Sequence, residues 1–185
     1  MIGNDANTAG PKGPVDRFLE TVRAGIFWCG VAAFSLTLGA LFAALFVNVV
    51  LRYAFARGIS WAHEIPFILF PWTVGGAIIV ATCLGRNIQI SLLTNTMSAG
   101  LRRAVAIGVH TITAAVCLGV VWTSAPILDA SKLMRLAETG IAQFYGMLGI
   151  VVAFVAIAVV SLIDLVFVAR GVGKLPAGEA ETSLS

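Results

Sequence analysis

Three polar side chains, Asn48, Arg52 and Glu64, fall in the short stretch that separates two long apolar runs. Asn48 and Arg52 are one helical turn apart at the end of the first run, and Glu64 opens the second. An acid at the mouth of a membrane span is costly without a partner, so we expect Glu64 to pair with Arg52 or Arg57. The alternatives are a solvated helix start for Glu64 and an Arg52 that simply reaches the membrane surface. We interpret the stretch as a structural polar corner, made of Asn48, Arg52, Tyr53, Trp61 and Glu64.

Other chemistry-bearing residues do not assemble into a recognisable catalytic or metal motif. The sequence contains no phosphate-binding glycine loop and no G-x-S-x-G, and its three cysteines do not have metal-ligand spacing. A membrane haem needs histidines on facing helices, and the only two are His63 and His110. Because we expect them near opposite membrane surfaces, we predict no enzyme activity, no cofactor and no metal, and a packing role for His110.

Four apolar runs, at about 25–51, 65–85, 104–128 and 140–165, place the protein in a bilayer. Each is long enough for a spanning helix, which takes roughly 20 residues. With 59% hydrophobic and 11% charged residues, the chain has too little polar surface for a soluble globule. Continuous rather than alternating hydrophobicity favours helices over barrel strands. The predicted fold class is therefore an all-α integral membrane protein with four transmembrane helices.

Two further segments have helical amphipathic spacing and predict one or two interfacial helices. The first begins at Pro14 and the second covers Asp129 to Glu138. For each, the alternative is a continuation of the neighbouring span into water. Residues 1–13 are predicted to be disordered, 14–170 to form one membrane domain, and 171–185 to be a flexible tail.

Small residues in the first two spans indicate close helix packing. They lie one turn apart or side by side on each helix, and Pro71 should bend the second span. The predicted packing positions are Gly39, Ala40, Ala43, Ala44, Trp72, Gly75 and Gly76.

Basic residues concentrate in the N-terminal segment, the second loop and the tail, rather than in the first and third loops. This bias predicts that both termini are cytoplasmic. Asp164, near the cytoplasmic end of the last span, is expected to reach the membrane surface. The formal net charge of +3 is explained by these flanking residues and does not require a nucleic-acid partner.

The stretch from Asn48 to Trp72 contains N-V-V-L-R-Y, I-S-W-A-H-E-I and P-W-T-V-G-G. It resembles the small, Q-type membrane subunit of tripartite ATP-independent periplasmic (TRAP) transporters, in which a span ending in R-Y is followed by W-x-x-E. The residues that match are Arg52, Tyr53, Trp61, Glu64, Trp72 and Gly75. The sequence departs from the family at His63, where an acid is common, and in the stretch after the second span, where Asn87 and Ser91 replace the usual His and Asp.

The resemblance implies a scaffold subunit in the bacterial inner membrane. Its partners would be a large multi-span membrane subunit, a periplasmic protein that delivers an organic acid, and membrane lipids, with uptake coupled to a cation such as sodium. Two alternatives remain: a membrane anchor of a redox enzyme, and the small subunit of a tripartite tricarboxylate transporter. The sequence does not identify the substrate, because in this family another chain selects it.

Overall fold

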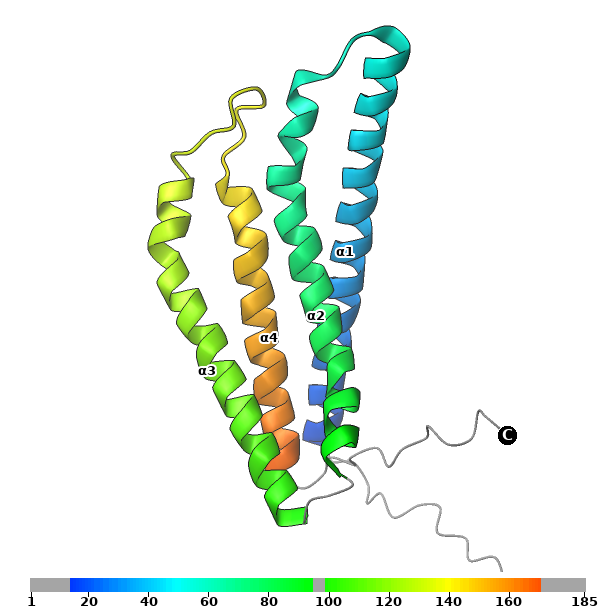
Figure 1. Ribbon diagram of the computed structural model, residues 1–185. Coiled ribbons are helices and arrows are strands. Elements are labelled where there is room, and N and C mark those ends of the chain that lie inside the picture. Colours follow the sequence, from blue (N-terminus) through cyan, green and yellow to red (C-terminus); the bar gives the residue numbers. More distant parts are fainter. Residues whose placement is uncertain (1–13, 95–98, 171–185) are drawn as a thin grey trace, which may run out of the picture.

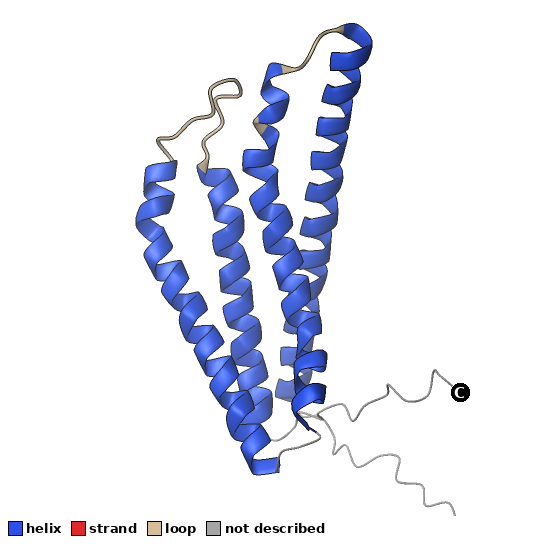
Figure 2. Cartoon of the chain, in the orientation of Figure 1, coloured by secondary structure: helices blue, strands red, loops and turns tan. Residues whose placement is uncertain are grey.

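The structure, a computed structural model, describes residues 14–94 and 99–170, without the side chains of 85–94, 99 and 102. Its four long helices are α1 (Pro14–Phe55), α2 (Ile65–Thr94), α3 (Ala99–Ser131) and α4 (Phe144–Arg170), and a short 3-10 helix, η1 (Ser60–His63), precedes α2. Figure 2 shows that loops make up the rest of the described chain, with no β-strand within it. Each long helix contains a stretch long and apolar enough to cross a membrane. The predicted all-α fold with four membrane-spanning helices is therefore confirmed.

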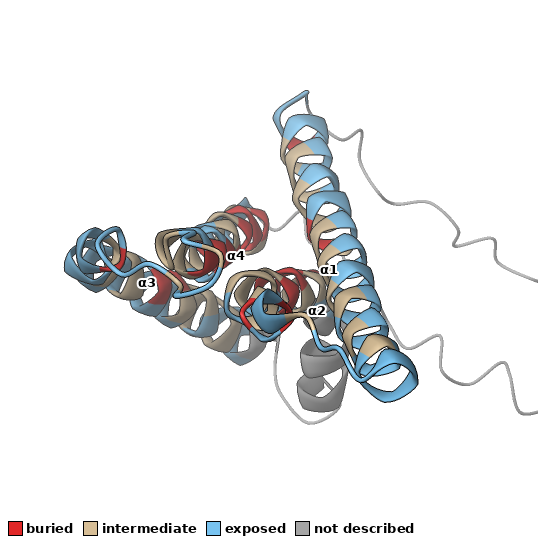
Figure 3. Cartoon of the chain, turned by 90° about the horizontal axis from the view of Figure 1, so that it is seen from above, coloured by how far each residue is buried: buried red, intermediate tan, exposed pale blue. Residues whose placement is uncertain are grey.

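The four helices stand in an open row, in the order α3, α4, α2, α1 (Figure 3). The chain makes two antiparallel hairpins, α1–α2 and α3–α4, and the hairpins meet where α2 packs against α4. In the most apolar stretch of α4, 44% of the residues are buried inside the structure, whereas in that of α1 only 6% are. The core therefore lies around α4, and α1 is an edge helix with one broad free side.

The two ends of the row differ in what they contain (Figure 1). The α1–α2 connection and the α3–α4 loop lie at the top of the figure, which we call the upper end. The start of α1, the end of α2, the start of α3 and the end of α4 lie at the lower end. The expected disordered segment 1–13 and flexible tail 171–185 lie outside the described residues.

Neither predicted amphipathic segment forms a separate interfacial helix. The segment that begins at Pro14 is the first part of α1, which runs unbroken for 42 residues. The second segment starts as the last turn of α3 and then leaves the helix after Ser131. A turn follows, in which Arg135 and Ala142 form an isolated antiparallel bridge and Gly140 has a left-handed φ of 66°. The helical spacing there was misleading because backbone pairing across the loop replaced helical hydrogen bonds.

Candidate functional site

Glu64 joins the two hairpins at the upper end. Its side chain is only 5% exposed and lies between η1 and α2. Oε1 accepts a hydrogen bond from the backbone N–H of Glu138 at 2.9 Å. Oε2 accepts two more, from the backbone N–H and the hydroxyl of Thr139, both at 2.9 Å. We call Glu64, Glu138 and Thr139 the upper joint, because this one carboxylate holds the α3–α4 loop against the start of α2.

The pairing expected for Glu64 is therefore not the one observed. Among the described side chains, no ion pair links Glu64 to Arg52 or Arg57, and both arginines are exposed. Tyr53 (84% exposed) and Trp61 (48%) also lie on the surface of the upper end. The loop satisfies the carboxylate with donors that are 74 and 75 residues away in sequence, so local charge spacing pointed to the wrong partner.

Asn48 holds the corner between α1 and η1. Its Oδ1 accepts a hydrogen bond from the backbone N–H of Ile59 at 2.8 Å. The helix ends at Phe55, and the left-handed φ of 52° at the next residue, Ala56, turns the chain out of α1. Asn48 thus fixes the connection that follows this turn, and through it the approach to Glu64.

Below the upper joint, glycines allow α2 and α4 to touch backbone to backbone. Pro71 lacks an N–H, so the carbonyl of Phe67, four residues earlier, loses its helical donor. Gly146 on α4 packs against this oxygen so closely that any side chain at 146 would overlap it.

Two of the predicted packing residues, Trp72 and Gly75, lie in the same seam. The ring of Trp72 covers Gly149, where an added Cβ would lie 2.8 Å from the ring. The indole Nε1–H donates to the carbonyl of Tyr145 at 2.8 Å. Gly75 faces Gly149 as well, with its missing Cβ only 3.0 Å from the Gly149 oxygen. The two hairpins are thus in close contact at Gly75, Gly146 and Gly149.

Gly76 lies on the other side of α2 and serves the contact with α1. A Cβ at Gly76 would lie 2.7 Å from the Phe34 nitrogen and 2.9 Å from the Gly30 oxygen. One turn away, the Thr73 hydroxyl donates to that of Thr37 at 2.9 Å, and Thr37 donates to the Ala33 carbonyl at 2.6 Å. Small residues and one interhelical hydrogen bond therefore hold α1 on α2, as is common in membranes.

The predicted small-residue positions of α1 fall into two groups, one partly buried and one exposed. Ala44 is partly buried on the side of α1 that faces α2, as Asn48 is. Gly39, Ala40 and Ala43 are exposed, and nothing approaches the missing Cβ of Gly39 within 4 Å. Within the described residues, no other helix covers these three positions.

The lower end holds four charged residues that sequence reasoning did not bring together. Arg23 Nε lies 4.0 Å from Asp164 Oδ1, and Arg170 Nη1 lies 3.8 Å from Asp16 Oδ1. The two acids are 2% and 7% exposed. We call these four residues the charge ladder. The expectation that Asp164 reaches the membrane surface is wrong, because α1 extends far enough to cover it.

A signal for the charge ladder was present in the spacing of α1. Asp16, Leu19, Arg23, Ile26 and Gly30 follow each other at intervals of three and four, the period of an inward face. Reading the first segment as an interfacial helix separated Asp16 and Arg23 from the span. Once α1 is one helix, both residues lie on the same side as Gly30, which is buried.

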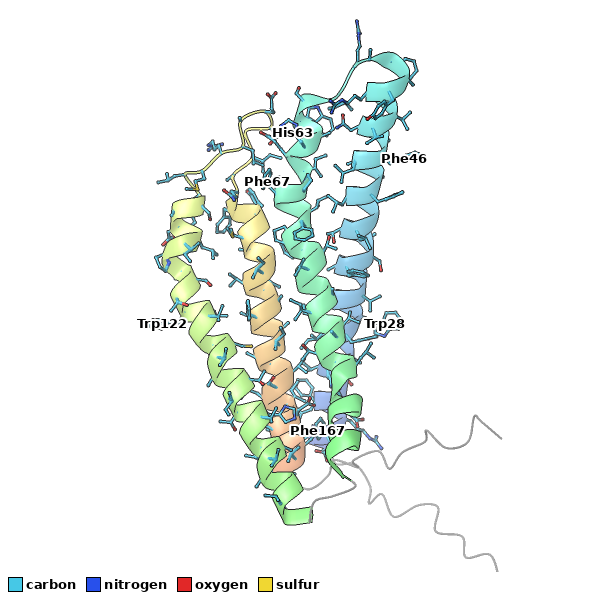
Figure 4. All side chains as sticks on the ribbon, viewed as in Figure 1. Trp28, Phe46, His63, Phe67, Trp122 and Phe167 are labelled. Carbon is cyan, nitrogen blue, oxygen red and sulfur yellow. The ribbon has the colours of Figure 1, made fainter. Side chains whose placement is uncertain are left out.

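Large aromatic side chains mark the free outer surfaces of the row. Trp28 on α1 and Trp122 on α3 point outward from opposite edges, and Phe167 lies between the helices at the lower end (Figure 4). Between α2 and α4, an apolar groove of about 300 Å³ opens beside the two prolines. Its lining is Pro66, Phe67, Phe70, Pro71, Gln143, Met147 and Ile150.

The two histidines lie apart, as the sequence predicted. His63 is exposed at the upper end (Figure 4), and His110 lies in the lower half of α3. Within the described ranges, no three His, Cys, Asp or Glu side chains are grouped so that they could hold a metal ion. The cysteines 29, 83 and 117 are free thiols.

The four spanning helices define a multi-pass membrane protein. Its two hairpins are connected by the upper joint at one end and by the charge ladder at the other. Residues 41–171 match the family described as tripartite ATP-independent periplasmic transporters, DctQ component, and the chain belongs to this family. This is a family of transporter components and bears out the resemblance seen between Asn48 and Trp72.

One curated relative is the uncharacterized protein y4mM of Sinorhizobium fredii (strain NBRC 101917 / NGR234). It is 22% identical over 153 residues, which cover 82% of this chain but 28% of the relative. The chain thus spans little more than a quarter of that protein's length. No solved structure matches the chain.

Proposed function

We propose that this protein is the small scaffold subunit of a TRAP-type secondary transporter. The observation that carries the proposal is the family match over residues 41–171, which includes α2, α3, α4 and the upper joint. In this role the chain supports a large membrane subunit during cation-coupled uptake of an organic acid. A periplasmic binding protein delivers the acid, and sodium is the coupling ion that the family resemblance favours.

The internal contacts support a static rather than a moving role. The two hairpins are joined by three hydrogen bonds at the upper joint, by glycine contacts along the seam and by the charge ladder below. A packed seam with contacts at both ends resists sliding of one hairpin on the other. The groove beside the prolines is lined almost wholly by apolar side chains, which suits lipid or a protein neighbour better than a carboxylate substrate.

The free side of α1 is the contact surface that we propose for the large subunit. Gly39, Ala40 and Ala43 are exposed there, and small residues allow another membrane helix to come close. Arg52, Tyr53 and Trp61 are exposed at the upper end, whereas Asn48 and Glu64 hold the corner from inside. The similarity to a fraction of the much longer y4mM is consistent with a module that works beside further polypeptide.

The proposed orientation follows the distribution of lysine and arginine. The lower end, with both termini, lies on the cytoplasmic side of the inner membrane, and the upper end faces the periplasm. The upper joint then lies on the side from which the binding protein delivers substrate.

Uptake in a strain that lacks only this chain tests the proposal. We expect uptake of the organic acid to be lost and to return when the chain is supplied from a plasmid. The purified chain should bind the large subunit and, alone in vesicles, should transport nothing. Full uptake without the chain, with both partners present, would contradict the scaffold role.

A pair of matched variants tests the contact surface. Gly39→Leu should abolish co-purification with the large subunit, because the added side chain blocks close approach. Gly119→Leu on α3, where nothing lies within 4 Å either, should leave co-purification unchanged. Equal binding by both variants would remove this face of α1 from the proposal.

A further inference from the structure

The α3–α4 loop exposes two neighbouring apolar side chains at the upper end. Leu133 is 87% exposed, the highest value among the large hydrophobic residues that the structure describes, and Met134 is 60% exposed. Exposed apolar residues also lead up to the pair along α3, at Trp122 and Ile127. Apolar surface of this kind gains free energy when it leaves water.

Hydrogen bonds within the chain satisfy part of the backbone around the pair. The N–H of Leu133 donates to the Ala130 carbonyl at 3.1 Å, and the carbonyl of Met134 accepts from the N–H of Gln143 at 2.9 Å. Unpaired backbone groups are unfavourable in the apolar part of a bilayer. The internal hydrogen bonds therefore lower the cost of bringing this turn into a membrane surface.

The two cations that flank the pair are held by the protein. Lys132 Nζ lies 2.7 Å from Asp129 Oδ1 and 5.5 Å from the centre of the Phe144 ring. Arg135 Nη1 donates to the carbonyl of Gly140 at 3.2 Å. Both charged groups thus bind back to their own chain, and the apolar pair between them is the part that stands out from the loop.

The level of the loop in the bilayer follows from α2. Its uncharged run from Ile65 to Gly85 is about 30 Å long as a regular helix, which equals the thickness of the hydrocarbon core. Glu64, the residue before this run, therefore lies at the upper boundary of the core. Because its carboxylate binds the N–H groups of Glu138 and Thr139 at 2.9 Å, the α3–α4 loop lies at that boundary as well.

We propose that Leu133 and Met134 insert into the phospholipid leaflet at the upper end and anchor the α3–α4 loop there. Lipid is the partner that this level implies, because the boundary between headgroups and acyl chains surrounds the helices there, and interfacial segments bury their apolar residues at this depth. The loop is then attached twice, to Glu64 on one side and to lipid on the other. This inference rests on the membrane-spanning fold and does not depend on the transport role.

Photocrosslinking of the full-length chain tests the proposal. Leu133→p-benzoylphenylalanine places a photoreactive group at a side chain that packs against little else, so the fold should be unchanged. The variant is reconstituted in vesicles of phosphatidylcholine and phosphatidylglycerol and irradiated. We expect the mass of the chain to increase by that of one phospholipid, and Met134→p-benzoylphenylalanine, the second site, should give the same adduct.

Arg57→p-benzoylphenylalanine is the matched control. Arg57 is exposed in the α1–α2 connection, which rises above the α3–α4 loop in Figure 1, so this probe should give no lipid adduct above background.

Three results would overturn the proposal. The absence of a lipid adduct at both Leu133 and Met134 would place the pair in water. An equal adduct at Arg57 would mean that the probe reaches lipid from any position at the upper end. A crosslink from Leu133 to the large subunit in place of lipid, in membranes that contain both chains, would make the pair a protein contact. None of these measurements involves uptake, so failure here and failure of the scaffold role are separate outcomes.

Discussion

The two hairpins are in contact at both ends of the helix row, but the chemistry of the contact differs between the ends. At the upper joint a single carboxylate accepts three hydrogen bonds of 2.9 Å, two of them from backbone N–H groups. At the charge ladder four side chains face each other at 3.8 and 4.0 Å. The upper contact is directional and short, whereas the lower one is a longer-range attraction between charges.

The difference shows what each end requires from the rest of the chain. Backbone donors depend on the shape of the α3–α4 loop, which the Arg135–Ala142 bridge and the left-handed Gly140 maintain. The charge ladder depends on the length and register of α1 and α4, and Arg23 also donates to the Cys83 carbonyl of α2. The upper joint therefore needs one side chain and a particular loop, and the charge ladder needs matching charges and regular helices.

Replacing Glu64 with alanine should have the largest effect. The N–H groups of Glu138 and Thr139 would lose their acceptor at a partly buried position, and donors are costly to leave unpaired there. We expect most of the assembled complex to be lost and the Tm of the isolated chain in detergent to fall clearly. Both are measured by size-exclusion chromatography and thermal unfolding.

Glu138→Gln is the matched control for that variant. It removes one negative charge from the same joint, but Glu138 contributes its backbone and its side chain is exposed. We expect wild-type assembly. If the two variants were equally damaging, net charge at the upper end, and not the acceptor geometry of Glu64, would explain the effect.

Gly146→Ala tests the seam between the two ends and should rank second. The new methyl group would overlap the Phe67 carbonyl, and because this is backbone the helices must move apart. Overpacking of this kind costs about 1–3 kcal/mol in the free energy of unfolding. Gly119→Ala, with open space around it, is the control and should be neutral or slightly stabilising. A wild-type Tm for Gly146→Ala would mean that α2 and α4 are not in backbone contact.

Trp72→Phe probes one hydrogen bond in that seam. Phenylalanine keeps an aromatic ring over Gly149 but loses the donor to the Tyr145 carbonyl. We expect a loss of about 0.5–1.5 kcal/mol, seen as a modest fall in Tm. Trp122→Phe, on the exposed edge of α3, should leave the Tm unchanged. A larger loss for Trp122→Phe would indicate that the outer edge, not the seam, carries the stability.

Much of the fold was readable from the sequence because hydrophobicity in a membrane is a local property. The four apolar runs each became part of a long helix, and the two glycines that follow Pro71 lie in tight contacts. What the sequence did not show was pairing at long range. Glu64 was assigned to nearby arginines because they were close in sequence, but its partners come from a loop that two helices bring back beside it.

The lower end was missed for a related reason. Asp164 looked like a residue that reaches water because its own helix ends nearby. The amphipathic spacing after Pro14 fitted an interfacial helix and a continuation of the first span equally well. The length of α1 changes both interpretations together, since an unbroken helix carries Arg23 to the level of Asp164. Helix length depends on packing against neighbours, which no local pattern in the sequence reports.

Salt concentration should change the stability contributed by the two ends differently, and this is the smallest of the expected effects. Arg170 is half exposed, so ions can screen its attraction to Asp16, and the Debye length falls from about 10 Å at 0.1 M to 3 Å at 1 M salt. We expect Arg170→Gln to lower the Tm slightly at low salt, with the difference from wild type shrinking at 1 M. The Tm difference between Glu64→Ala and wild type should stay constant over the same range, because neutral backbone donors hold a covered carboxylate. If the Tm difference for Glu64→Ala also shrank with salt, the upper joint would be held by charge after all, and the contrast between the two ends would not stand.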